Sequence, residues 1–515
     1  MTTCLPIRQW ARRRERRRGV ANDRDTPTRG RLGPAGGEDT TVLRRIRLIC
    51  EENALLVLLI ASFIAVLLVL TPSLVIADSW FTLIAGREIV EYGLPHSNAI
   101  TVLGQGREWI DQQWLAHLAY YGAEVLGGLR LVTLANIVLI AAGYTLAVAA
   151  ARHRGASQRS TLLFALLVIL ASPWAWQVRA QTLALPLFAG LLWLLIDHQQ
   201  RRSARVLFAL PILIVWGNVH GTAVMAAILV SGAGAIGLIQ RRGSARVATV
   251  LLVGAPLCLL VSPYALDLPG YYHLMLIDPP FKGLIVEWRP TRPEAKTVLF
   301  FTLAVATAVL AVWQRRRLTL FEAFALALTF WVGFDAIRGV TWFVLTVLVI
   351  VPQLLDGALR LRDARPHRGA NLVISGICLG GLAIGLALTA AQPTSWFESA
   401  WPTKALPAIA RATENPSSTV YAISSYSDWL YWHQPELRGR LAYDIRFEIY
   451  RRPTIQATAD FVSMRGPDWA KQADGYDVVV IDRPKAGKMT RALIADGLSL
   501  RYSGAKIAVL TRASP

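Results

Sequence analysis

The chain has 515 residues, of which 54% are hydrophobic, and its mean hydropathy is +0.41. This composition is too apolar for an ordinary soluble protein of that length and indicates a membrane protein. The net charge of +20 is typical of nucleic-acid-binding proteins, but the basic residues fall between apolar segments instead of forming one face, which excludes nucleic acid as a partner.

The first 53 residues are polar and rich in arginine, with runs at 12–14 and 16–18. They contain no short apolar stretch followed by a small-residue cleavage site, so no removable signal peptide is predicted. We expect a basic, disordered cytoplasmic leader that fixes the orientation of the chain. Contact between this leader and anionic lipid headgroups is the alternative.

About eleven apolar runs follow, each close to the length that crosses a bilayer as a helix. They lie at 54–77, 131–151, 161–177, 181–197, 206–219, 221–240, 247–263, 297–313, 319–334, 339–356 and 371–391. Every second loop between them is basic, and the leader is basic too. The positive-inside rule therefore predicts a multi-pass protein of the plasma membrane with a cytoplasmic N-terminus. An odd number of spans places the C-terminus outside.

Three segments are expected on the external side. The first external loop (78–130) carries two amphipathic helical patterns, and the second (262–296) is rich in proline. The tail (392–515) alternates strand-like runs at 419–424, 476–482 and 505–511 with a helix-like run at 488–496, which indicates a small α/β domain. The predicted fold class is mainly α: a polytopic bundle over 54–391 with a C-terminal α/β extracytoplasmic domain. None of the four cysteines lies in the tail, so disulfides cannot hold that domain.

Asp78 immediately follows the first predicted span. A carboxylate at the boundary between membrane and water can accept a proton while substrate still reaches it. The alternative is an interfacial acid that ends one helix and caps the next.

Arg179 and Arg338 each stand between two apolar spans on the expected outer side. A guanidinium in such a place is costly unless it is paired, and it is usually functional. Arginine also binds phosphate oxygens in bidentate fashion, so both are candidates for a phosphate site. The alternatives are side chains that reach lipid headgroups and, for Arg338, a local pair with Asp335.

His220, Glu287 and Trp288 are further candidates for substrate binding. His220 lies in a turn between two spans, where it can relay a proton, bind phosphate or be structural. Glu287 and Trp288 lie in the second external loop. The indole can stack on a sugar ring or belong to the aromatic belt of the membrane interface. In the tail, the segments 426–429 and 443–446 either bind an acceptor glycan or pack the domain.

An acidic residue at the start of a long first external loop with its own helices resembles the GT-C superfamily of integral-membrane glycosyltransferases. That group includes protein mannosyltransferases and aminoarabinose transferases, and the closer likeness is to a bacterial branch of it. The residues that carry the resemblance are Asp78, Phe81, Leu83, Gly86, Asn98 and the segments 93–95, 109–115, 177–181, 216–221, 262–264, 287–290, 428–432 and 443–446.

The resemblance implies transfer of a sugar from a polyprenyl-phosphate-type donor to an extracytoplasmic glycan, lipid or protein acceptor of the cell envelope, usually with inversion at the anomeric centre. It implies Asp78 as the general base, with Asp111 as a second base or an orienting partner. The branch often has histidine or glutamate where this chain has Thr82, Gln112 and Gln113. Metal ligands are therefore scarcer here, and we expect chemistry without a metal or other cofactor.

Two other functions stay open from the sequence. One is an O-antigen-type polymerase or ligase, whose defining loop lies later in the chain. The other is a non-enzymatic glycolipid transporter or assembly scaffold, which would need charged residues along its spans. A transferase instead predicts one outward-facing pocket that joins Asp78 to the external arginines and opens sideways to lipid.

Overall fold

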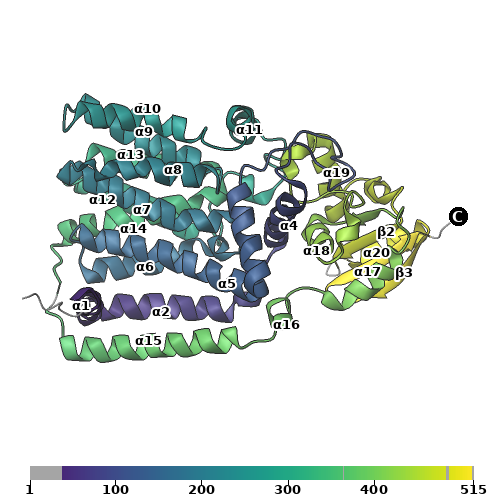
Figure 1. Ribbon diagram of the computed structural model, residues 1–515, viewed down its shortest axis with the longest axis horizontal. Helices are drawn as coiled ribbons and strands as arrows, with labels where there is room; N and C mark the ends of the chain where they lie inside the picture. The colour runs from purple at the N-terminus through teal and green to yellow at the C-terminus, as the bar shows by residue number, and fades with distance from the viewer. Residues whose placement is uncertain (1–36, 364, 483–485, 513–515) are drawn as a thin grey trace, which may run out of the picture. The chain divides into compact units, whose positions relative to one another are not determined.

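The computed structural model describes residues 37–363, 365–482 and 486–512. The chain divides into two compact units, Met1–Leu48 and Ile49–Pro515. Within the described residues the first unit contributes only the start of α1 (Gly37–Glu52), a helix in a stretch that the sequence assigns to the disordered leader. The rest of that leader, 1–36, lies outside the described residues. The second unit contains a helical bundle and a C-terminal domain (Figure 1).

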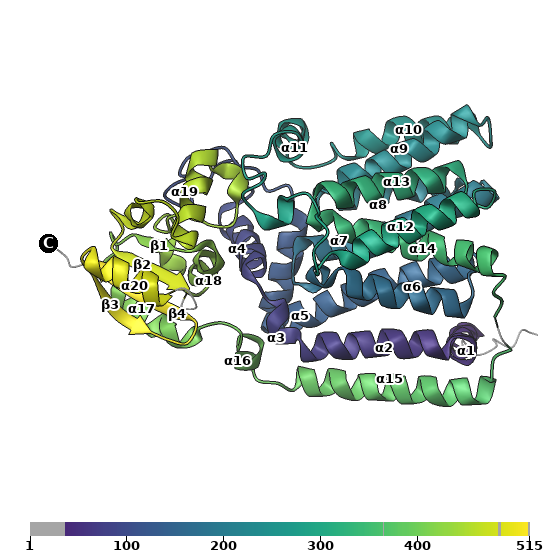
Figure 2. The same ribbon diagram turned by 180° about the vertical axis from the view of Figure 1, so that it is seen from behind.

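Eleven apolar helices of the described residues run side by side and form the bundle (Figures 1 and 2), as the sequence predicts. They are α2 (Ala54–Val69), α5 (Trp114–His153), α6 (Gln158–Ala171), α7 (Ala180–Arg201), α8 (Ala209–Gly217), α9 (Ala223–Ile239), α10 (Ala245–Cys258), α12 (Val298–Trp313), α13 (Leu320–Asp335), α14 (Val340–Leu359) and α15 (Arg368–Ala390). Among the described residues, four helices are long and apolar enough to cross a membrane, or up to five when a bent pair counts as one span.

The bundle is apolar on its outside as well as in its core. Large apolar side chains such as Val253, Val305 and Ile377 are 53%, 65% and 70% exposed. A soluble protein does not leave so much apolar surface in contact with water. The chain is therefore an integral membrane protein, and the predicted fold class is confirmed. α14 packs against five neighbouring helices at the centre of the bundle, whereas α15 lies along α2 at its edge.

At one end of the bundle, α4 (Ala77–Tyr92) and the first limb of α5, which is the part before its bend at Gly127, lie across the ends of the other helices (Figure 1). α5 bends at Gly127 and Gly128, and the φ angle of 64° at Gly128 suits a residue without a side chain. α4 packs closely on the first limb, because a Cβ at Gly86 would lie 2.4 Å from the carbonyl oxygen of His117. We call this end, which faces the C-terminal domain, the domain end, and the opposite end, with the basic loops, the basic end.

The C-terminal domain is built around a four-stranded sheet in the order β1-β2-β4-β3. β1 (Val420–Ala422) runs parallel to β2 (Val478–Asp482), and β4 (Ile507–Arg512) is antiparallel to both β2 and β3 (Leu498–Ser503). Three strands and α20 (Ala486–Ala495) lie where the sequence predicts them. β3 was not predicted, because most of its side chains are exposed. The remaining α-helices of the described residues are α3 (Thr71–Leu74), α11 (Leu268–Leu276), α16 (Thr394–Phe397), α17 (Leu406–Ala412), α18 (Ser424–His433) and α19 (Arg452–Ser463).

The first external loop fastens the C-terminal domain to the bundle. The buried guanidinium of Arg87 on α4 donates to the carbonyl oxygens of Tyr431 and Trp432, at 2.9 and 3.1 Å. Arg107 donates to the carbonyl oxygen of Ile449 at 2.8 Å. These hydrogen bonds, all of them to backbone carbonyl oxygens, join the first loop to the C-terminal domain.

Candidate functional site

A cavity of about 900 Å³ opens at the domain end, between the bundle, the second external loop and the C-terminal domain. Six of the seven residues singled out from the sequence line it. They are Asp78, Arg179, His220, Glu287, Trp288 and Arg338. The cavity therefore joins Asp78 to both Arg179 and Arg338.

Backbone contacts at the helix ends bring Asp78 and Arg179 together. Asp78 lies in the first turn of α4, where the hydroxyl of Ser79 donates to the carbonyl oxygen of Val178 at 2.7 Å. The amide of Val178 in turn donates to the carbonyl oxygen of Leu74 at 2.9 Å. Arg179 follows directly, and its Nε lies 3.2 Å from Oδ2 of Asp78. The ends of two spans, about 100 residues apart in sequence, are thus held as one unit.

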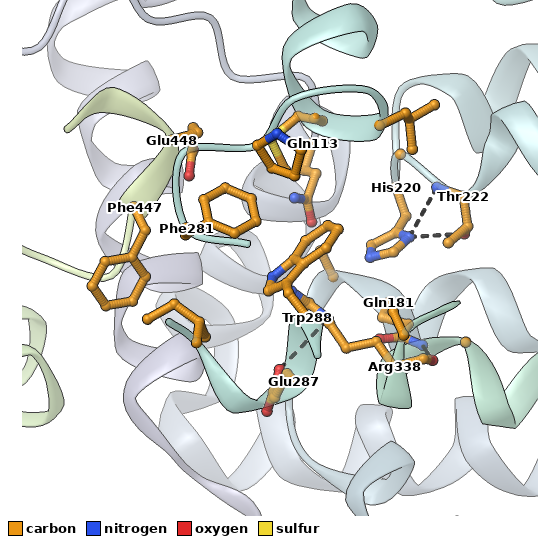
Figure 3. A pocket seen from close by; sticks show the side chains of 18 of the residues that line it. Gln113, Gln181, His220, Thr222, Phe281, Glu287, Trp288, Arg338, Phe447 and Glu448 are labelled. Atoms are coloured by element: carbon orange, nitrogen blue, oxygen red, sulfur yellow. Dashed lines mark hydrogen bonds and ion pairs between the residues drawn. The ribbon is translucent and has the colours of Figure 1, made fainter. Parts of the chain in front are cut away.

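Glu287 connects the two arginines. Its carboxylate accepts from Nη1 and Nη2 of Arg179, at 2.9 and 2.7 Å, in a bidentate pair. Nε of Arg338 lies 3.6 Å from the same carboxylate, and the Arg338 guanidinium lies over the ring of Trp288, 5.3 Å from its centroid. Arg338 therefore pairs with Glu287 and not with Asp335. Figure 3 shows Glu287, Trp288 and Arg338 together at the cavity wall.

The ion cluster is reachable from the cavity. The side chains of Asp78, Glu287 and Arg338 are 30%, 37% and 26% exposed, against 9% for Arg179. Burial opposes ionisation of Glu287, but the neighbouring Arg338 and Arg179 outweigh it and lower its pKa. Glu287 is thus ionised at neutral pH. Arg179 donates to it through both Nη1 and Nη2, whereas Arg338 makes only the longer contact of 3.6 Å.

His220 is held as a neutral side chain beside this cluster. Its Nδ1 lies 2.8 Å from the hydroxyl of Thr222 (Figure 3). Burial, followed by the positive charges of Arg338 and Arg179, lowers the pKa of His220 to about 3. An anion that binds to the arginines would remove part of that repulsion and raise the proton affinity of the ring.

Asp111 is the one singled-out residue that does not line the cavity. It is 2% exposed, and its Oδ2 lies 2.6 Å from Nδ1 of His117, a ring that does line the cavity. Asp111 thus contacts the cavity-lining ring of His117 without lining the cavity itself. The sequence analysis missed His117, although an acid followed six positions later by histidine at the start of a helix was a usable signal.

The cavity also has an apolar wall formed by helices of the bundle. Met225 and Ile228 of α9, Leu328 and Trp331 of α13, and Trp342 of α14 line it. Ile228 and Trp331 are 44% and 64% exposed, so the wall continues onto the apolar outer surface of the bundle. A ligand in this cavity would meet ions at one end and an apolar surface at the other.

The C-terminal domain also contributes residues to the cavity wall. Ser424, Arg446, Phe447 and Glu448 line the cavity. The sequence left glycan binding and packing open for the segment 443–446. Arg446, in this segment, lines the cavity and is also buried within the protein. Glu448 was not singled out, because no feature of a lone glutamate in an irregular segment indicates where it lies.

Within the described ranges, no group of three or more histidine, cysteine, aspartate or glutamate side chains is arranged to hold a metal ion. Chemistry without a metal stays a prediction.

No protein-family model matches the chain, and no curated protein matches it. Among solved structures, the chain is similar to ArnT from Cupriavidus metallidurans bound to undecaprenyl phosphate, with 13% identity and a TM-score of 0.48 over 87% of this chain and 97% of that one. It is also similar to ArnT from Cupriavidus metallidurans in the apo state, with 14% identity and a TM-score of 0.47 over 87% and 96% of the two chains. At this identity no residue role passes from ArnT to this chain.

Proposed function

We propose that this protein is a glycosyltransferase that moves a sugar from a polyprenyl-phosphate-type donor to an acceptor outside the cell. The observation that carries the proposal is the two-sided cavity. It places a carboxylate and two arginines next to an apolar wall that is continuous with the outer surface of the bundle. A lipid that ends in a phosphate-linked sugar has the same division between an apolar chain and an anionic head.

In this reaction the oxygen of an acceptor hydroxyl attacks the anomeric carbon of the donor sugar. The bond between that carbon and the phosphate oxygen breaks, and the phosphate keeps the electron pair. Asp78 takes the hydroxyl proton as general base, and attack from the face opposite the leaving group inverts the anomeric centre. Oδ1 of Asp78 is available for this role, since the ion pair with Arg179 uses Oδ2.

Arg338 would receive the leaving phosphate. Its guanidinium is held over Trp288 and near Glu287, and it makes no side-chain hydrogen bond to the described residues. Lys282 lines the same cavity and adds a second cation. Fixed positive charges that await the developing charge of a leaving group are an efficient form of transition-state stabilisation. Arg179 would position Asp78 and Glu287 and would not bind phosphate directly.

The orientation of the chain is part of this proposal. The basic loops lie at the end of the bundle opposite the C-terminal domain (Figure 1). The positive-inside rule therefore supports a cytoplasmic N-terminus and an extracytoplasmic cavity in the plasma membrane. We further propose that transfer requires no divalent metal.

The test is a transfer assay with purified protein in detergent. Polyprenyl-phosphate-linked sugars are supplied one at a time, with a total extract of cell-envelope glycans and lipids as acceptor, and free polyprenyl phosphate is measured. Sugar-dependent release that needs the acceptor extract and persists in EDTA would support the proposal. Release from none of the donors would contradict it and favour a transporter or scaffold.

A further inference from the structure

The wall that the C-terminal domain contributes to the cavity differs chemically from the cationic wall. In Figure 3, Glu448 and Phe447 lie on one side of the cavity and His220 and Arg338 on the other, with Phe281 and Trp288 between them. The proposed function uses only the cationic and apolar walls. The polar groups of the C-terminal domain are therefore unassigned.

Arg446 is the fixed centre of this second wall. Its Nε and Nη2 donate to Oδ2 of Asp444 at 2.8 and 2.5 Å, and Nη2 also donates to Oδ1 of Asn98 at 2.5 Å. The guanidinium lies over the ring of Trp109, 4.4 Å from its centroid. The residue is only 2% exposed, and Nη1 has no hydrogen-bond partner among the described residues.

An unsatisfied donor of this kind is unfavourable by about 1–3 kcal/mol, more for a charged group. Proteins rarely retain one in a rigid setting unless a ligand or water completes it. Because Arg446 lines the cavity, the missing partner can come from there.

Two neighbouring side chains offer further hydrogen-bonding atoms to the same space. Glu448 accepts from Nε1 of Trp109 with Oε1, at 3.3 Å, and it lines the cavity. The hydroxyl of Ser424, at the start of α18, is unpaired within the described part of the chain. The ring of Phe447 adds an apolar face. Donors, acceptors and aromatic faces in one pocket are the groups that bind a polyhydroxylated ring.

The charges of this wall limit which ring fits. The guanidinium of Arg446 is already paired with the carboxylate of Asp444 at 2.5 Å, and the carboxyl group of Glu448 lies at the same wall. A carboxylate brought into this pocket would be repelled or would have to be protonated. Hydroxyl groups meet no such barrier.

We propose that Ser424, Arg446 and Glu448 form a subsite for a saccharide ring that carries no carboxylate group. The inference rests on the proposed function in one respect, that a saccharide enters this cavity. The ring belongs either to the donor lipid or to the acceptor glycan, and the two sources are separated by the experiment.

The variants are Ser424→Ala, Glu448→Gln and the double variant. Glutamine keeps the acceptor for Trp109, so the fold is preserved, whereas Arg446 is left unchanged because it ties the domain to the first external loop. The matched control is Glu436→Gln, the same change at an exposed position of the same domain. Apparent Tm in detergent verifies that all variants fold.

Binding is measured by tryptophan fluorescence with three probes: farnesyl phosphate alone, farnesyl-phosphate-linked glucose and farnesyl-phosphate-linked glucuronic acid. For a donor sugar, each single variant weakens glucose-lipid binding about 3- to 10-fold, as expected for one lost hydrogen bond. Binding of farnesyl phosphate alone is unchanged, and wild-type protein binds the glucuronic acid probe more weakly than the glucose probe.

For an acceptor sugar, binding of all three probes is unchanged, and the double variant raises the acceptor concentration needed for half-maximal transfer. The proposal is overturned if the double variant changes neither the binding of the glucose-lipid probe nor the acceptor concentration needed for half-maximal transfer. It is also overturned if the double variant weakens the binding of farnesyl phosphate and of its sugar conjugate equally. Failure of the proposed function looks different: wild-type protein would transfer from no donor, yet sugar-dependent binding and its loss in the variants would persist.

Discussion

Both ends of the bundle carry ion pairs between arginine and carboxylate side chains, but only those at the domain end face a cavity. At the basic end, Arg154 pairs with Glu322, and Nη2 of Arg154 donates to Oε1 of Gln353 at 3.1 Å. The side chains of Arg154 and Glu322 are 4% and 3% exposed. At the domain end, Arg179 pairs with Glu287 and Asp78, and these two carboxylates are 37% and 30% exposed. One set of ions is sealed and the other faces a cavity.

A second sealed cluster at the basic end strengthens the contrast. Asp356 accepts from the amide and hydroxyl of Ser157, at 2.5 and 2.6 Å, and from the hydroxyl of Ser160 at 2.6 Å. Its hydrogen-bonding capacity is used within the protein. An ion whose partners are all internal holds helices together, whereas one with an unused oxygen or N–H at a cavity can act on a ligand. The difference predicts separate effects of mutation at the two ends.

Asp78→Asn should have the largest effect, and it should lower the rate of transfer without lowering stability. Loss of a general base lowers transfer about 100- to 10,000-fold. The apparent Tm should stay close to that of the wild type, because asparagine keeps the shape and the position in the first turn of α4. Initial rates and thermal unfolding in the same detergent provide the measurement. A variant with retained activity would remove Asp78 from the mechanism.

Glu322→Ala should show the reverse pattern. It leaves Arg154 buried without its carboxylate, which destabilises a protein by about 3–5 kcal/mol. Transfer per folded molecule should be unchanged, since the cavity is at the other end of the bundle. The double variant Arg154→Met, Glu322→Leu should recover most of the stability. If Glu322→Ala lost activity while its stability stayed at the wild-type level, the predicted difference between the two ends of the bundle would be contradicted.

His220 should make the domain end sensitive to acid. The pKa of this ring in the folded protein is about 3, below the value of about 6.5 expected when it is exposed. Its contribution to stability is therefore present above pH 6.5 and is lost as the pH falls toward 3. Between pH 7 and pH 5 the wild type should lose about 2 kcal/mol more than His220→Asn. His273→Asn, at an exposed position of α11, serves as the control in urea unfolding at the two pH values.

Ser160→Ala should have the smallest effect of the four. It removes one of the hydrogen bonds to Asp356 and leaves both bonds from Ser157, so the expected loss is about 1 kcal/mol. Transfer kinetics should match those of the wild type. A loss as large as that of Glu322→Ala would mean that the Asp356 cluster and the Arg154 pair act as one unit, which a double-mutant cycle would measure.

Hydropathy predicted the helices of the bundle because they carry apolar side chains both on the faces toward lipid and on the faces that pack inside. Each helix is therefore a continuous apolar run in the sequence. Asp78 and Arg179 were found by the same route, since a charged residue at the end of an apolar run stands out. β3 was missed because its side chains are mostly exposed.

The polar wall of the cavity was not predictable in this way. Glu448 and Trp109 meet across 339 residues of sequence, and neither belongs to a periodic pattern. Their proximity depends on how the C-terminal domain sits on α4, which is set by contacts such as those of Arg87 with backbone carbonyls. A single sequence carries no local signal of such a pairing. Asp111 and His117 differ from this pair, because they lie only six residues apart and their spacing at the start of a helix was a local signal.

The bonds from Arg87 and Arg107 to residues 431–450 join an early segment of the chain to a late one. The ribosome delivers Asp78, Arg179 and the eleven bundle helices before it reaches the strands of the last domain. Until those strands fold, Arg87 lacks its acceptors and the fully buried Trp80 lacks its cover of Trp401 and Trp432. A nascent chain would thus contain all bundle helices while the domain end of the bundle is still uncovered. Premature stop codons beyond α15 should yield membrane-inserted but inactive products that quality-control proteases recognise by that uncovered face.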